Sequence, residues 1–408
     1  MCSSDLMPCD DAKGLLPGRA PPGRGGALGP LLVAHLTDDA APIALAATVQ
    51  WLAPLLFALG AGVLVDRLDR RRVVIAVDLV RCAVLALLAT VVLGGVVDVW
   101  IVIGALFCLA SAEVVADTAS SALLPMVVER DQLTVANARL GVGFVVINQL
   151  AGPPIGALLF GIGLAVPAIA QVVLIAASVL LLTRVSAGAH APEPARGALR
   201  EIGEGMRWAW RHGAVRTLMA TALIFNLTFG AAWSVLVLYA RERLGLGGVG
   251  FGLITTVQAA GGVLGTLAYG RLTARFSLFT IMRVGLIVET LTHLALALTR
   301  TAWVAMPVFF AFGAHAFIWG TTSTTVRQRA VPGPLQGRVG SVNMVAGYGG
   351  LVIGSGIGGA LAQAHGVTAP FWFAFVGSAV FVVLWWHQLR HLVEDGPVSP
   401  PAQAAASG

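Results

Sequence analysis

Eleven apolar runs, each about as long as a bilayer is thick, limit how this chain can fold more than any other feature. A helix needs roughly 20 apolar residues to cross the hydrocarbon core. The runs lie at 43–65, 73–97, 99–118, 140–160, 162–183, 217–239, 249–269, 282–299, 302–320, 341–363 and 368–387. Because lipid offers the backbone no hydrogen bonds, and because the runs lack the alternation of barrel strands, the sequence predicts an all-α membrane protein.

The balance of charged and apolar residues supports the same conclusion. Charged residues make up 11% of the 408 residues and apolar residues 57%, whereas a soluble domain carries about 25% charged residues. The net charge of +6 comes from short arginine clusters between the apolar runs, not from one basic face. We therefore expect a lipid bilayer as partner and no nucleic acid.

The arginines also predict an orientation, because they concentrate in every second connection. The turn at 66–72 alone carries four of them, while the alternate connections hold three: Arg241, Arg243 and Arg300. By the positive-inside rule, the arginine-rich side faces the cytoplasm. We expect a multi-pass protein of a bacterial inner membrane, with its central linker and its C-terminus in the cytoplasm.

Composition divides the chain into five parts. Residues 1–26 are rich in proline and glycine and predict an irregular leader. The segments 27–184 and 217–390 predict two helical halves, joined by a cytoplasmic linker at 185–216 that contains an amphipathic helix. Residues 391–408 predict a disordered tail.

The two halves resemble each other. Three pairs of residues recur at offsets of 204, 202 and 203: Arg67 with Arg271, Gly152 with Gly354, and Trp100 with Trp303. Repeated halves of about 200 residues are typical of secondary transporters. The first helix is the exception, because the apolar stub 27–36 has only about half the length needed to cross a bilayer. We expect this helix to be incomplete, from a truncated or misread gene start, which leaves about eleven full transmembrane helices.

The turn after the first long run carries the most specific motif. The stretch 62–74 resembles the loop signature of the major facilitator superfamily, G-x-L-x-D-R-x-G-R-[RK]. It matches at six positions: Gly62, Leu64, Asp66, Arg67, Arg70 and Arg71. Asp69 replaces the second glycine, which puts the tight turn in doubt. The resemblance implies two pseudo-symmetric six-helix halves and a conformational latch in this loop, with Arg271 and Arg338 in the related loops of the second half. The alternative is an anchor of positive charge only.

Two further stretches narrow the resemblance. The segment 327–339, with Leu124, Pro125, Leu133, Ala136 and Asn137 in the first half, resembles the enterobactin-exporter and macrolide-efflux branch. A second motif, Gly152, Pro153 and Gly156, is similar to the antiporter signature of the superfamily and has Gly354 and Gly358 as counterparts. An antiport-specific role and simple close packing at a helix kink both remain open for these residues.

Ionisable residues at membrane depth are the candidates for function, since they are expensive to bury. Glu113 and Asp117 are four residues apart and share a helix face. An offset of 202 residues places His315 opposite Glu113, and the resemblance implies that both helices line the central cavity, as Asn226 does on another helix. We predict a proton and substrate pathway through these four residues. A structural polar contact is the alternative.

Two other intramembrane pairs have spacings that allow the partners to satisfy each other locally. Asp78 and Arg81 are three residues apart, and Glu289 and His293 are four residues apart. We interpret both pairs as structural contacts on peripheral helices.

The sequence also predicts that the chain is not an enzyme and has no cofactor or metal. Its only lysine, Lys13, lies outside any phosphate-binding loop, and the four cysteines lack metal-site spacing. Two G-x-G-x-x-G strings, at 245–250 and 354–359, lie in a turn and in an apolar run instead of after a soluble strand.

These features together predict a secondary active transporter, which acts as a monomer on a small-molecule substrate and protons. Its expected function is proton-coupled efflux of a small amphipathic molecule, such as a drug, a macrolide-like compound or a siderophore, by alternating access. Two alternatives stay open: uptake on the same scaffold, since a fold does not determine function, and a transport-inactive membrane sensor.

Overall fold

Helices account for nearly all of the chain that the computed structural model describes. The described residues are 8–9, 26–27, 30–127, 152, 155–156, 159, 162–183, 198–332 and 335–386. In the N-terminal part the helices are α1 (Pro30–Leu36), α2 (Ala40–Arg67), α3 (Arg70–Leu93), α4 (Val99–Val127) and α7 (Val166–Leu182). After α8 (Ala198–Arg211) follow α9 (Gly213–Trp233), α10 (Leu236–Leu238), the π-helix η3 (Tyr239–Arg243), α11 (Gly248–Arg275), α12 (Leu278–Leu298), α13 (Ala302–Ala330), α14 (Gln336–His365) and α15 (Ala369–Trp385). The two-residue strands β1 (Pro8–Cys9) and β2 (Gly26–Ala27) pair antiparallel.

The prediction of an all-α membrane protein is confirmed. Ten of the eleven apolar runs coincide with described helices, and the run at 140–160 falls largely outside the described residues. Eight of the helices are long and apolar enough to cross a membrane, and α7 and α15, of 17 residues each, are shorter apolar helices. Of the apolar stub at 27–36, the structure describes the seven-residue helix α1, which packs against α2.

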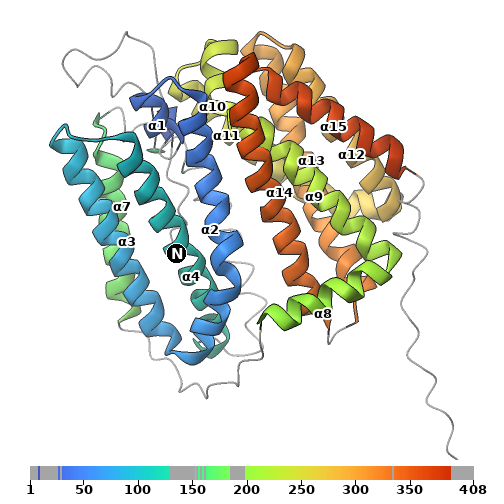
Figure 1. Ribbon diagram of the computed structural model, residues 1–408, viewed down its shortest axis with the longest axis horizontal. Helices are drawn as coiled ribbons and strands as arrows, with labels where there is room; N and C mark the ends of the chain where they lie inside the picture. Colours follow the sequence, from blue (N-terminus) through green and yellow to red (C-terminus); the bar gives the residue numbers. More distant parts are fainter. Residues whose placement is uncertain are drawn as a thin grey trace, which may run out of the picture.

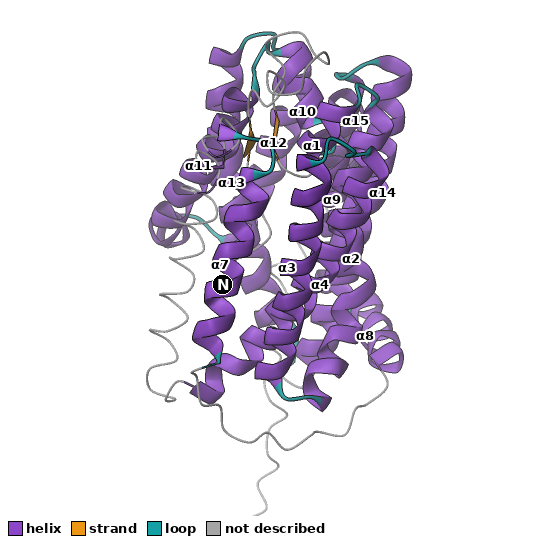
Figure 2. Cartoon of the chain, turned by 90° about the vertical axis from the view of Figure 1, so that its left-hand side faces the viewer, coloured by secondary structure: helices purple, strands orange, loops and turns teal. Residues whose placement is uncertain are grey.

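The long helices form two bundles that lie side by side (Figure 1). In the N-terminal bundle α3 packs between α4 and α7, and in the C-terminal bundle α13 packs against α11 and α12 while α9 packs against α14. The bundles meet where α2 contacts α14. Most helices run along the long direction of the view in Figure 2, and α8 lies near one end of them.

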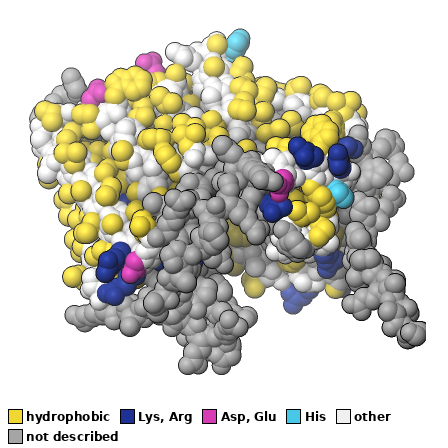
Figure 3. Space-filling model, turned by 60° about the horizontal axis from the view of Figure 1, so that its bottom comes forward, with side chains coloured by type: hydrophobic (Ala, Val, Ile, Leu, Met, Phe, Trp, Pro, Cys, Tyr) yellow, Lys and Arg dark blue, Asp and Glu magenta, His cyan; other side chains and the backbone are white. Residues whose placement is uncertain are grey.

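The surface matches a bilayer environment. Large apolar side chains are exposed along the flanks of the helices, among them Leu87, Trp303 and Val383, which are 63%, 89% and 73% exposed. A soluble monomer exposes no apolar surface of this extent. Figure 3 shows arginine side chains near the end of the molecule that carries α8, while apolar side chains cover much of the visible flank.

The turn between α2 and α3 contains the position that departs from the family signature. Asp69 is the N-cap of α3, and its Oδ1 accepts hydrogen bonds from the backbone N–H groups of Arg71 and Arg72 at 3.0 and 3.2 Å. An aspartate at this position satisfies amide groups that the helix itself leaves unpaired. The turn is therefore tight without the second glycine.

Glycines bring α9 and α14 into backbone contact. A Cβ added at Gly354 would lie 2.1 Å from the carbonyl oxygen of Leu227, and one at Gly358 would lie 2.1 Å from that of Ala231. Gly350 of α14 and Gly230 of α9 contribute to the same crossing. Small residues at this four-residue spacing permit the close helix packing that is common in membranes.

A seam between the bundles runs along α2 and α14. Thr48 and Ser355 share a hydrogen bond of 2.8 Å, and a Cβ added at Gly359 would lie 2.5 Å from the Cβ of Ala44. Beyond the start of α2, Arg241 of η3 contacts Asp38 at 3.2 Å. These contacts lie in the first half of α2, away from its arginine-rich end, so the bundles are closed against each other at the end where α2 begins.

Candidate functional site

Three ionisable side chains meet inside the C-terminal bundle. The carboxylate of Glu289 on α12 lies 3.0 Å, through Oε1, from Nε2 of His293 and 3.4 Å, through Oε2, from Nε2 of His315 on α13. Their exposed fractions are 1%, 0% and 6%. Glu289 lies nine residues before the end of α12, or about 14 Å along the helix axis at 1.5 Å per residue. We call Glu289, His293 and His315 the buried triad.

This geometry adds a contact to two of the residues considered in the sequence. His315, predicted to lie in the proton and substrate pathway, contacts Glu289 of α12, where Gly285 leaves room for its ring. A Cβ added at Gly285 would lie 3.0 Å from Cε1 of His315. The pair Glu289–His293 forms as expected, but both residues are fully buried and Glu289 has His315 as a second partner, so the interpretation as a peripheral local pair is incomplete.

Aromatic rings cover the buried triad on the side of α9. Phe225, Phe229 and Trp233 follow one another at four-residue spacing, and their side chains are half-buried. They pack on two buried rings of α13. Phe225 stacks on Trp319 at 5.8 Å between ring centroids, Phe229 stacks on Phe312 at 5.7 Å, and Trp233 is tilted against Phe312 at 4.5 Å. We call these five residues the aromatic ladder.

The ladder also contacts the histidines directly. The ring of Trp233 meets that of His293 edge-on with centroids 6.0 Å apart, and the ring of Phe225 lies 6.1 Å from that of His315. The ladder therefore separates the buried triad from the half-exposed face of α9.

The acidic residues predicted in the N-terminal bundle, Glu113 and Asp117, have other neighbours than the buried triad. Glu113 is half-buried and Asp117 is exposed on α4, and both lie within electrostatic reach of the phenol of Tyr348 on α14. Tyr348 in turn faces Trp51 of α2, with ring centroids 6.4 Å apart. These residues come from both bundles, as a site between the two halves requires.

Asn226 lies on α9 near the crossing with α14. Its amide Nδ2 donates to the carbonyl oxygen of Ala222 at 2.7 Å, and its Cβ lies 3.1 Å from the position of a Cβ added at Gly350. Its side chain is thus at the helix crossing and bonds to its own helix.

The residues predicted to form a latch are spread over three places. Gly62, Asp66 and Arg67 lie in the last turns of α2, and Arg271 is exposed near the end of α11. The guanidinium of Arg71 donates from Nε to the carbonyl oxygen of Leu182 at 2.8 Å and from Nη2 to that of Thr183. A cation at the C-terminus of α7 stabilises that helix end.

Arg70 and Arg338 occupy helix starts. Arg70 is the first residue of α3. Arg338 lies near the start of α14, where its Nη1 is 2.7 Å from Oε2 of Glu204 on α8. A Cβ added at Gly205 would lie 2.7 Å from the carbonyl oxygen of Arg338, so α8 packs directly on the backbone of α14.

The residues of the predicted kink motif are described in part. Gly152 and Gly156 are helical and buried, and Pro153 lies outside the described residues. Their counterparts Gly354 and Gly358 lie at the crossing of α14 with α9.

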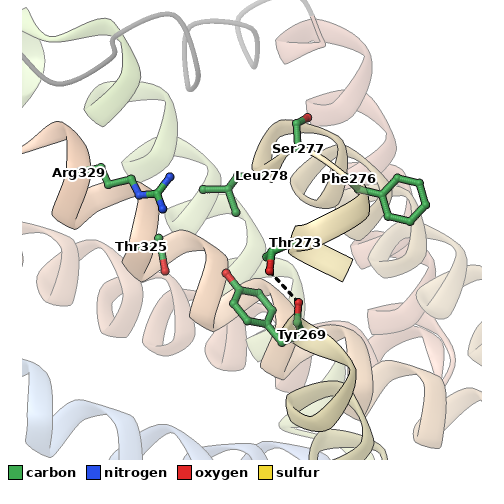
Figure 4. A pocket seen from close by; sticks show the side chains of 7 residues that line it. All are labelled: Tyr269, Thr273, Phe276, Ser277, Leu278, Thr325 and Arg329. Carbon is green, nitrogen blue, oxygen red and sulfur yellow. Dashed lines mark hydrogen bonds between the residues drawn. The ribbon is translucent and has the colours of Figure 1, made fainter. Parts of the chain in front are cut away.

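One cavity, of about 360 Å³, lies at the arginine-rich end of the C-terminal bundle (Figure 4). Its lining is Tyr269, Thr273, Phe276, Ser277, Leu278, Thr325 and Arg329. The residues come from the ends of α11 and α13 and from the turn before α12, so the cavity belongs to one bundle and is not a passage between the two. In the described part of the chain, no group of three or more His, Cys, Asp or Glu side chains is placed to hold a metal ion.

Sequence reasoning missed Glu289 and His293 as members of a larger cluster, and the whole aromatic ladder. The four-residue spacing of Phe225, Phe229 and Trp233 was a signal for a shared face. The contact of Glu289 with His315, by contrast, depends on how α12 and α13 are rotated against each other, which one sequence does not reveal.

Comparison with known proteins agrees with this architecture. The family model described as "Transmembrane secretion effector" matches residues 29–396. No curated protein sequence is similar enough to count as a match.

Among solved structures, the nucleoside transporter NupG is similar with a TM-score of 0.64 at 14% identity, over 90% of this chain and 94% of that one. A bacterial homologue of the iron transporter ferroportin is similar in its inward-facing state with a TM-score of 0.63 at 17% identity, over 86% of this chain and 94% of that one. Its outward-facing state gives a TM-score of 0.53 at 18% identity, over 85% and 90%. At these identities the likeness concerns the fold alone. The chain belongs to the transmembrane secretion effector family, within the major facilitator superfamily of transporters.

Proposed function

We propose that this protein is a proton-coupled exporter that moves a small amphipathic molecule across the membrane by alternating access. The observation that carries the proposal is the placement of titratable side chains at membrane depth, in a chain with 11% charged residues. Glu289 and His293 are buried inside a span, and Glu113 lies half-buried on another. Ionisable residues in such positions mark ion and substrate pathways in membrane proteins.

The seam between α2 and α14 supports the mechanism. In alternating access, two halves rock about a central site so that only one side is open at a time. The contacts of Thr48 with Ser355 and of Asp38 with Arg241 join the halves at the end where α2 begins. With the arginine-rich end in the cytoplasm, the contact end faces outward, and this conformation admits substrate from the cytoplasm.

The resemblance to the enterobactin-exporter and macrolide-efflux branch favours export of a drug, a macrolide-like compound or a siderophore. The matched family description, which refers to secretion, points in the same direction. An aromatic face on α9, together with Glu113 and Asp117 opposite Tyr348, offers both apolar and polar contacts to an amphipathic molecule.

Dye transport by everted membrane vesicles tests the proposal. Vesicles that contain the protein should accumulate ethidium when respiration acidifies their interior, and an uncoupler should release it. Vesicles from cells without the protein are the control. Accumulation that persists in the presence of the uncoupler excludes proton drive.

Uptake on the same scaffold is the second candidate, because the fold does not determine direction. Counterflow of labelled solutes in proteoliposomes distinguishes export from uptake, because it shows on which side of the membrane the substrate binds more tightly. A transport-inactive sensor is the third. It is favoured if Asp66→Ala and Glu113→Ala change no transport phenotype.

A further inference from the structure

We propose that the buried triad of Glu289, His293 and His315 is the binding site of the coupled proton, and that the aromatic ladder separates it from the path of the substrate. The inference rests on the proposed function and deepens it, because it moves the proton site from the interface between the halves into the C-terminal bundle. It assigns the proton to a carboxylate flanked by two imidazoles.

Charge balance provides the first argument. With both imidazoles neutral, the triad carries the single negative charge of Glu289 in a site that is at most 6% exposed. An uncompensated charge in a low-dielectric interior is costly, and a nearby cation or a proton removes that cost. Binding of one proton to the carboxylate makes the triad neutral as a whole.

Among the residues that the structure describes, the helices packed against the triad supply no other compensating charge. Tyr269 of α11, the nearest titratable residue of that helix, contacts Thr322 at 3.4 Å between the oxygens, and Arg271 and Arg275 are exposed at the far end of the same helix. The described residues of α15 include no titratable side chain. Those of α9 include only Arg216, near its first turn, and Arg327 and Arg329 lie in the last turn of α13.

The arginines nearest the two ends of α12 bind other groups. Arg283, six residues before Glu289, lies over the rings of Phe279 and Trp386 at 4.1 Å and donates to the carbonyl oxygen of Trp386 at 2.7 Å. At the other end, Arg243 of η3 donates to the carbonyl oxygen of Thr299 at 3.0 Å.

Tyr239, the first residue of η3, donates to the carbonyl oxygen of Leu296 at 2.6 Å. Burial raises the pKa of this phenol above its usual range, so it stays a neutral donor.

Hydrogen-bond accounting provides the second argument. Oε2 of Glu289, Nδ1 of His293 and Nε2 of His315 are buried and have no hydrogen-bond partner among the residues that the structure describes. The contact of 3.4 Å between Oε2 and the ring of His315 is short enough for charge attraction but does not meet hydrogen-bond geometry. A buried polar atom without a partner is rare in a purely structural cluster. Here the three atoms are one carboxylate oxygen and two ring nitrogens of the same cluster, which leaves positions at which an added proton forms a hydrogen bond.

The ladder provides the third argument. Trp233 touches the ring of His293 and Phe225 touches that of His315, while both are half-exposed on α9. A shift of α9 against α12 and α13, within the C-terminal bundle, would open or close the triad without moving Glu289. The proton then binds at the triad and the substrate passes on the other side of the ladder, and α9 links the two sites.

Infrared spectroscopy of the purified full-length protein in lipid nanodiscs tests the proposal without a transported substrate. Acidification of the wild type should produce the carbonyl stretch of a buried, protonated carboxyl group. Glu289→Gln, which has nearly the same shape but cannot ionise, should lose this band. Thr290→Val is the matched control, because Thr290 is the adjacent residue, is 8% exposed and donates to the carbonyl oxygen of Leu286 in its own helix at 2.9 Å. A band that Glu289→Gln retains overturns the proposal.

A second variant keeps the test decisive if Glu289→Gln does not fold. His293→Gln leaves the carboxyl group in place and removes one imidazole. It should shift the pH midpoint of the same band, whereas Thr290→Val should not. An unshifted midpoint contradicts a shared proton and overturns the proposal.

Ethidium accumulation by everted vesicles separates failure of this inference from failure of the proposed function. Loss of the uncoupler-sensitive accumulation in Glu289→Gln, but not in Thr290→Val, supports the proton site. Accumulation that remains uncoupler-sensitive in Glu289→Gln refutes the triad and leaves the proposed function standing. If the wild type itself shows no uncoupler-sensitive accumulation, the proposed function fails.

Discussion

The crossing of α9 and α14 offers a sharp test of the packing described above. At Gly354 an added Cβ would lie 2.1 Å from the carbonyl oxygen of Leu227 and 3.0 Å from the backbone nitrogen of Ala231. Gly356, half a turn away on the same helix, has nothing within 4 Å of its added Cβ. The substitutions Gly354→Ala and Gly356→Ala therefore add the same methyl group at a closed and at an open position of one helix.

The structure sets the size of the effect. Real Cβ atoms essentially never approach other atoms closer than 3.0 Å, so Gly354→Ala needs a displacement of about 0.9 Å between two backbones. A backbone carbonyl cannot rotate away as a flexible side chain can. Overpacking of this kind costs about 1–3 kcal/mol, partly offset at both positions by the higher helix propensity of alanine. For a unit of the size of the C-terminal half, we expect a decrease in Tm of about 2–10 °C.

Tryptophan fluorescence during heating of the purified variants in detergent measures the difference. We expect Gly354→Ala to unfold at a lower temperature than the wild type and Gly356→Ala to unfold at or slightly above it. Equal unfolding temperatures for the two variants would refute the close crossing of α9 with α14.

Three further predictions use the same kind of comparison. Asp69→Ala should destabilise the protein by about 0.5–2 kcal/mol, because it removes the N-cap of α3, and Asp69→Asn should restore most of the loss in a thermal melt. Gly359→Leu should separate the start of α2 from the end of α14, because its Cβ has no room at the seam; spin-label distances between these ends should lengthen, and Gly356→Leu should leave them unchanged. Gly205→Ala should loosen α8 from α14 and speed tryptic cleavage in the linker, whereas Gly203→Ala, at an open position, should not; equal cleavage rates would argue against the docking.

Most of the fold follows from the sequence, because a bilayer imposes one rule on every span. The apolar runs predicted ten of the described helices, since a segment in lipid must satisfy its own backbone. Asp69 was harder to interpret. The missing glycine of the signature suggested a disturbed turn, whereas the carboxylate caps the following helix and makes the same turn possible.

The site could be predicted only in part, because it depends on how helices are rotated. Spacing within one helix correctly paired Glu289 with His293, since residues four apart share a face. The offset between the halves aligned His315 with Glu113 but did not predict which way its ring points. The ring packs against Gly285 on the neighbouring helix. Contacts between distant segments require the packing of side chains that a single sequence does not specify.

Transport by the purified protein in proteoliposomes, with an imposed pH gradient and without ATP, tests the proton-coupled mechanism most directly. The mechanism predicts that ethidium moves against its concentration gradient only while the pH gradient lasts, and that protons move in the opposite direction at the same time. Ethidium transport that continues at equal pH against a concentration gradient, or that proceeds with no proton movement, would contradict it.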